Sequence, residues 1–161
     1  MDAFEAWLDQ NRDSVALRDS SYRKVLQKER RYADGSGEVN TELATLGDGV
    51  LRMFLCELLW QESRERLSER KQGYESDRVL VSVIAKHYGM LDRMHFDRED
   101  EHLPVDYVYC GDKHKYIATA VEACLGLFWL HTQDPVVMRE IVKGWMALID
   151  GEGMVPSSQI P

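Results

Sequence analysis

The sequence lacks an apolar run of membrane-spanning length, and its N-terminus lacks the basic region and apolar stretch of an export signal. Its 3 cysteines, Cys56, Cys110 and Cys124, are odd in number and lie at no metal-ligand spacing, which argues against a disulfide framework. Packing is their expected role. We therefore expect a soluble intracellular protein, cytoplasmic by default, with no membrane partner.

Zinc-ligand spacing and an excess of positive charge are also lacking. The five histidines form no H-x-x-x-H or equivalent pattern, so zinc ligation is not expected. The net charge of -8 argues against a general nucleic-acid binder, and no DNA partner is expected. Basic residues gather only at 23–31 and 64–71, where interleaved glutamates favour solvated helix faces.

The 161 residues, 44% apolar and 30% charged, suffice for one domain with a genuine core. We place this domain at 1–150, followed by a flexible tail at 151–161. Apolar periodicity predicts an all-α fold, and only 105–109 alternates as a strand would. Helices are expected around Phe4–Leu8 and over 14–31, 41–66, 76–88, 113–131 and 136–149, with Gly89 ending the fourth and Asp134-Pro135 opening the last.

The first candidate functional residue is Asp48. It lies within 40–51, which reads NTELATLGDGVL and leads into a helix that is apolar nearly all round, as a central buried helix would be. Taken alone, Asp48 is also explained as an acid favoured near a helix start, or as the partner of Arg52 in an i,i+4 pair.

The second candidate is Glu122, which lies in an otherwise apolar helix. Lys115, Thr119, Glu122 and Gly126 fall at i, i+4, i+7 and i+11, so they form one polar and small stripe. An acid inside an apolar helix needs a partner. We expect this stripe to bring the Glu122 carboxyl opposite Asp48.

These segments resemble the ribonuclease III family. Residues 40–51 match its N-E-x-L-E-x-L-G-D-A-V-L pattern, and 115–126, KYIATAVEACLG, match K-x-x-A-D-x-x-E-A-x-x-G. Residues 16–22 and 81–90 resemble two further family segments in the same order. Two acids of the pattern are missing, because Ala44 and Thr119 stand in their places.

The resemblance implies an all-α ribonuclease III fold that forms a homodimer through the helix beginning near Thr41. It also implies a Mg2+-dependent endoribonuclease, with Mn2+ as a substitute, acting on double-stranded or structured RNA. Asp48 and Glu122 would be the catalytic metal ligands, supported by Lys115 and Thr119. Clustered carboxylates suit this chemistry because they hold hard cations. Trp60, Trp129 and Trp145 are expected as core or dimer anchors.

Two branches of the family fit the reduced acid set. The compact mini-ribonuclease III enzymes, which mature ribosomal RNA, have L-A-x-x-G-D and T-A-x-E-A where this chain has 43–48 and 119–123. Degenerate ribonuclease III domains instead keep the fold as an RNA- or protein-binding module. Whether this chain cleaves RNA stays open, and no double-stranded-RNA-binding domain is expected.

Overall fold

The computed structural model describes residues 1–19, 39–95 and 111–153. Over these residues the fold is all-α without a strand, as expected, and its only β-type pairing is an isolated parallel bridge between Arg18 and His95. The helices are α1 (Ala3–Gln10), α2 (Thr41–Glu62), α3 (Leu67–Glu75), α4 (Asp77–Val79) continuing into the π-helix Leu80–Ala85, α5 (Met90–Arg93), α6 (Lys115–Thr132) and α7 (Pro135–Gly151), with 3-10 turns at Val15–Leu17 and Gly111–His114.

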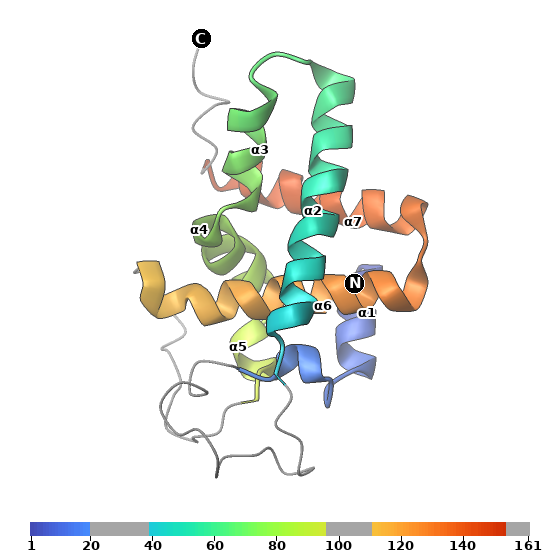
Figure 1. Ribbon diagram of the computed structural model, residues 1–161, viewed down its shortest axis with the longest axis vertical. Helices are drawn as coiled ribbons and strands as arrows, with labels where there is room; N and C mark the ends of the chain where they lie inside the picture. The colour runs from blue at the N-terminus through green and yellow to red at the C-terminus, as the bar shows by residue number, and fades with distance from the viewer. Residues whose placement is uncertain (20–38, 96–110, 154–161) are drawn as a thin grey trace.

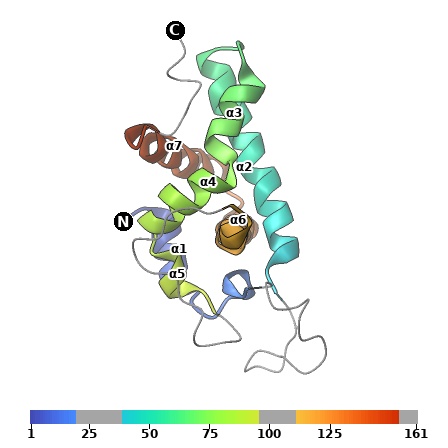
Figure 2. The ribbon, with the colours of Figure 1, turned by 90° about the vertical axis from the view of Figure 1, so that its left-hand side faces the viewer.

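Helix α6 lies at the centre of the fold. Figure 2 shows it end-on, with α2 on one side and α1 and α4 on the other. Half of its residues are buried, and they are mostly small or aliphatic: Ile117, Ala118, Ala120, Val121, Ala123, Cys124, Leu125, Gly126 and Phe128. Small side chains let neighbouring helices approach closely, so α6 sets the position of the elements around it.

Several expected helix boundaries are confirmed. Gly89 adopts a left-handed backbone with φ 62° between the π-helix and α5, a conformation that glycine adopts at little cost. Asp134 caps α7, because its carboxylate accepts from the Val136 amide at 3.0 Å, and Pro135 begins the helix.

The expectation of one helix over 14–31 is wrong at its start. Residues Val15–Leu17 form a single 3-10 turn, after which Arg18 is extended. The Leu17 carbonyl accepts from the His95 amide at 2.8 Å, and the Asp19 amide donates to the His95 carbonyl at 3.1 Å. Pairing with a segment distant in sequence therefore replaces the local helix. Residues 20–38 lie outside the described residues, as do the segment 105–109 and all of the tail after Gly153.

The expected helix over 41–66 ends early, and α3 was not foreseen. Ser63 is extended with φ -165°, and Arg66 is left-handed with φ 51°. The chain then reverses, so that α3 runs back beside the end of α2 (Figure 1).

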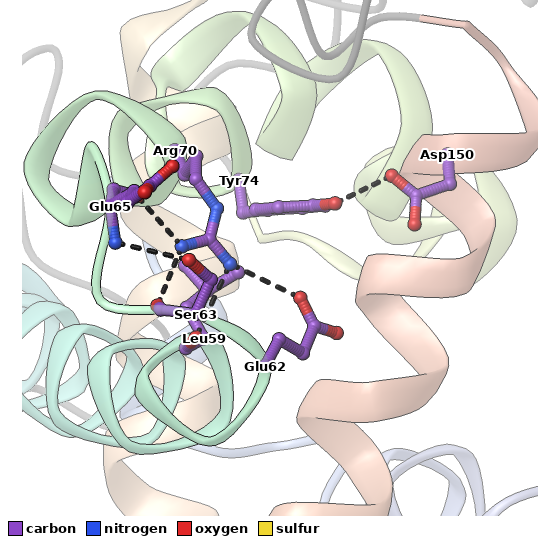
Figure 3. A network of polar contacts seen from close by, with 7 residues as sticks. All are labelled: Leu59, Glu62, Ser63, Glu65, Arg70, Tyr74 and Asp150. Atoms are coloured by element: carbon purple, nitrogen blue, oxygen red, sulfur yellow. Dashed lines mark hydrogen bonds and ion pairs between the residues drawn. The ribbon is translucent and has the colours of Figure 1, made fainter.

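Arg70 of α3 stabilises this reversal (Figure 3). Its guanidinium donates to the carbonyls of Leu59, Ser63 and Glu65 at 3.2, 2.8 and 3.0 Å, so it ties the end of α2 and the turn that follows to α3. Four residues later, the Tyr74 hydroxyl donates to the Asp150 carboxylate at 2.6 Å and ties α3 to α7.

Helices α2 and α6 cross in backbone contact at Gly47 and Gly126. A Cβ added to Gly47 would lie 1.6 Å from the Glu122 carbonyl oxygen, and one added to Gly126 would lie 2.5 Å from the Leu43 carbonyl oxygen. Both neighbours are backbone, so they cannot move aside as a side chain can. Only glycine fits at these two positions.

We predict that Gly47→Ala destabilises the protein by about 3 kcal/mol or more, because the added methyl group forces α2 and α6 apart. Gly144→Ala, inside α7, is the matched control, since nothing lies within 4 Å of its Cβ. It should be neutral or stabilise by about 0.5–1 kcal/mol, since alanine favours a helix interior. Urea unfolding measures both, and equal effects of the two substitutions would contradict the close crossing.

Candidate functional site: paired carboxylates at the helix crossing

Asp48 and Glu122 are brought together by the crossing of α2 and α6. Gly47, which directly precedes Asp48, touches the backbone of Glu122 itself. The neighbouring carboxyl groups therefore come close enough for the charge of Asp48 to act on Glu122. This is the convergence that the spacing of the two segments predicts.

The Glu122 carboxyl is strongly perturbed by this arrangement. Its pKa is raised to about 8, first by burial and then by the negative charge of Asp48. Asp77, the first residue of α4, adds another negative charge in the same direction. Arg52 acts the other way but does not offset them. At neutral pH Glu122 therefore retains its proton.

Arg52 joins Asp48 to a second acid on α3. Its Nη2 lies 3.1 Å from Asp48 Oδ2, as an i,i+4 pair, and its Nε lies 3.2 Å from Glu75 Oε2. Lys71 Nζ in turn lies 3.0 Å from Glu75 Oε1. The local pairing of Asp48 with Arg52 is thus present alongside the approach to Glu122.

Thr119 and Lys115 lie on α6, about one and two turns before Glu122. The Thr119 hydroxyl donates to the Lys115 carbonyl at 3.0 Å, and the Lys115 side chain is exposed. The main charges acting on the Glu122 carboxyl are Asp48, Asp77 and Arg52, and Lys115 is not among them. Ala44, one turn before Asp48, is buried in the core with 8% of its surface exposed.

The donor set fits a hydrated hard cation. In the described part of the chain, no three or more histidine, cysteine, aspartate or glutamate side chains gather as metal ligands. Mg2+ does not require them, because it keeps several waters and binds through one or two carboxylates with substrate phosphates. A divalent cation at the pair would displace the proton that Glu122 now carries. Asp48 and Glu122 are the residues that would hold it.

Sequence reasoning missed three charged residues at this site. Asp77 and Glu75 come from elements that were not expected there, and Arg52 was considered only as a local partner of Asp48. The one available signal for Asp77 was Ser76 before it, whose hydroxyl accepts from the Val79 amide and starts α4. No local pattern indicated that α4 begins near Glu122.

The fold and the site define an all-α protein with paired carboxylates at a helix crossing. No family model matches the chain. It is similar to a curated protein named Ribonuclease 3 from Corynebacterium jeikeium (strain K411), with 29% identity over 147 residues, which cover 86% of this chain and 54% of the relative. The chain therefore spans about half the length of that relative. Together with the all-α fold, this similarity supports a ribonuclease III family relationship.

No helix among the described residues is long and apolar enough to cross a bilayer.

We predict that Glu122 makes the metal-free protein less stable as pH rises from about 4.5 to about 8. Its folded pKa of about 8 exceeds the ordinary value of 4.5, so in this window the unfolded chain loses the proton that the folded protein keeps. Glu122→Gln resembles the protonated side chain and removes this titration. The free energy of unfolding of the variant, minus that of the wild type, should therefore increase across the window. A constant difference in urea unfolding would show that the Glu122 pKa is ordinary.

Proposed function

We propose that the chain is a metal-dependent endoribonuclease that cleaves double-stranded or structured RNA. The observation that carries the proposal is the meeting of Asp48 and Glu122 at a crossing that leaves room only for glycine. The name of the relative, Ribonuclease 3, supports the same activity. RNA processing, including ribosomal RNA maturation, is the setting in which we expect it to act.

The proposed cofactor is Mg2+, with Mn2+ as a substitute, held by Asp48 and Glu122. When bound, such an ion neutralises charge on phosphate oxygens and lowers the pKa of a water ligand. The Asp48 side chain is 36% exposed, which leaves it open to the cation and to the phosphate of a substrate. Glu122 is partly buried and would give up its proton when the cation binds.

Thr119 and Lys115 are proposed to support the substrate. The Thr119 hydroxyl already donates to a carbonyl, so its oxygen serves as the acceptor for a water of the site. Lys115 is exposed and offers a compact positive charge to a backbone phosphate of RNA. This local charge is needed because the whole chain is acidic.

A non-catalytic RNA- or protein-binding module is the second candidate. The observation favouring it is the replacement of two family acids by Ala44 and Thr119, which leaves two carboxylates for catalysis. A binding module would need the fold and the surface but not the metal.

Cleavage assays separate these two functions. With duplex RNA and Mg2+ or Mn2+, we predict cleavage by the wild type and a loss of about 100-fold or more in Asp48→Asn, because the variant lacks a charged metal ligand. Glu140→Gln on α7, whose side chain is 71% exposed, is the control and should cleave normally. Equal trace cleavage by the wild type and Asp48→Asn would instead indicate a contaminating nuclease and favour the binding module.

A homodimer through α2 is part of the same proposal. Leu46, Met53 and Trp60 are 36%, 53% and 50% exposed and recur every seven residues, so they form one apolar face along α2. Exposed apolar surface of this kind is typical of an interface. Of the tryptophans, Trp145 is a core residue and Trp60 stays the candidate dimer anchor.

We predict that the wild type sediments as a dimer at micromolar concentration and that Met53→Glu sediments as a monomer, because the charge would be buried in the interface. Val136→Glu introduces the same charge at an apolar α7 position that is 65% exposed, and it should stay dimeric. A monomeric wild type in sedimentation velocity would contradict the dimer.

A further inference from the structure

Arg52 holds the metal-ligand candidate Asp48 from the same helix. Its Nη2 lies 3.1 Å from Asp48 Oδ2 and 3.5 Å from Oδ1, so one guanidinium nitrogen approaches both carboxylate oxygens. These are the oxygens that a cation would need. An exposed i,i+4 pair is ordinarily weak and would yield to a divalent ion.

Glu75 makes this pair more than an ordinary helix pair. It accepts from Arg52 Nε at 3.2 Å, and its side chain is only 11% exposed. Lys71, 16% exposed, fixes the other Glu75 oxygen at 3.0 Å. The Lys71–Glu75 pair is shielded from water and is screened less than a surface pair, whereas the Arg52 side chain that it holds is 52% exposed. Glu75 is therefore a positioning residue, anchored on α3, that keeps the guanidinium beside Asp48.

The positive charge of Arg52 opposes the binding of Mg2+ at Asp48. A fixed guanidinium within a few ångströms of Asp48 repels Mg2+ and shares its ligand. The linked ion pairs of Lys71, Glu75, Arg52 and Asp48 alternate in charge. Each carboxylate in this series therefore has a positive partner without a metal ion.

We propose that Arg52 is the resident counter-ion of Asp48 and competes with Mg2+ for its carboxylate, so that the Lys71–Glu75–Arg52 chain raises the Mg2+ concentration that the site requires. This inference rests on the proposed function, because it takes Asp48 as a metal ligand. It goes further by assigning a control of metal affinity to residues that do not bind the metal.

The test is Mg2+ affinity measured on the full chain by melting temperature and, with Mn2+, by the electron paramagnetic resonance of the free ion. Arg52→Met removes the charge and keeps an unbranched side chain, whereas Arg52→Lys keeps the charge. Lys143→Met removes one charge from an exposed ion pair on α7, and it controls for the change in net charge. Arg52 also favours the ionised form of Glu122, so its removal would change the protonation of Glu122 near neutral pH. Titrations are therefore run at pH 9, above the Glu122 pKa of about 8.

We expect Arg52→Met to bind Mg2+ and Mn2+ about three- to tenfold more tightly than the wild type, as the loss of one nearby positive charge implies. Arg52→Lys and Lys143→Met should stay within about twofold of the wild type. Metal that stabilises Arg52→Met but not the wild type would support the inference most strongly.

Unchanged or weaker binding in Arg52→Met, with a wild type that binds metal, would overturn the inference and leave the proposed function intact. Equal tightening in Arg52→Lys or in Lys143→Met would also overturn it, because the effect would then not depend on the charge beside Asp48. If metal stabilises neither the wild type nor Arg52→Met, the two-carboxylate metal site itself is contradicted, and this inference falls with it.

Discussion

The backbone contact between Gly47 and Gly126 is the constraint on which the rest of the structure depends. The two glycines let α2 lie directly on α6, with a carbonyl oxygen where any Cβ would be. Asp48 follows Gly47 immediately, and Glu122 provides the backbone that Gly47 touches. The same contact that packs the central helix therefore sets the distance between the two acids.

This proximity has an electrostatic cost that the fold tolerates. Glu122 is largely buried and lies beside the negative charge of Asp48, and for these reasons, burial first, it retains its proton up to about pH 8. Asp77 increases that cost, and Arg52 reduces it. Destabilising charge at a helix crossing is typical of a site kept for binding or chemistry, because packing alone would favour an apolar pair.

The sequence predicts the central elements because their causes are local. The apolar pattern of α6, the Asp134-Pro135 start of α7 and the left-handed Gly89 each depend on residues within one or two turns. The pairing of Asp48 with Glu122 was also predictable, since polar and small residues share one stripe of an apolar helix. Helix periodicity therefore suffices to predict that Asp48 and Glu122 lie close together.

What the sequence does not predict depends on contacts across the fold. The helix expected after Ser14 gives way to a pairing with His95, and the α2–α3 reversal depends on Arg70 reaching back to the carbonyls of α2. The i,i+4 spacing indicates that Arg52 meets Asp48, but Glu75 and Asp77 reach the site from α3 and α4, and no spacing along the chain indicates their arrival. Glu75 and Asp77 belong to the site because of where the fold places α3 and α4, which their residue types do not indicate.

The central claim is that the α2–α6 crossing builds a cation site from two carboxylates. The most direct measurement is the anomalous diffraction of crystals grown with Mn2+ at pH 9, where Glu122 is ionised. The account predicts a manganese peak between the carboxylates of Asp48 and Glu122, with waters completing its coordination. A well-ordered site with no peak there, or manganese bound only elsewhere on the chain, would contradict it.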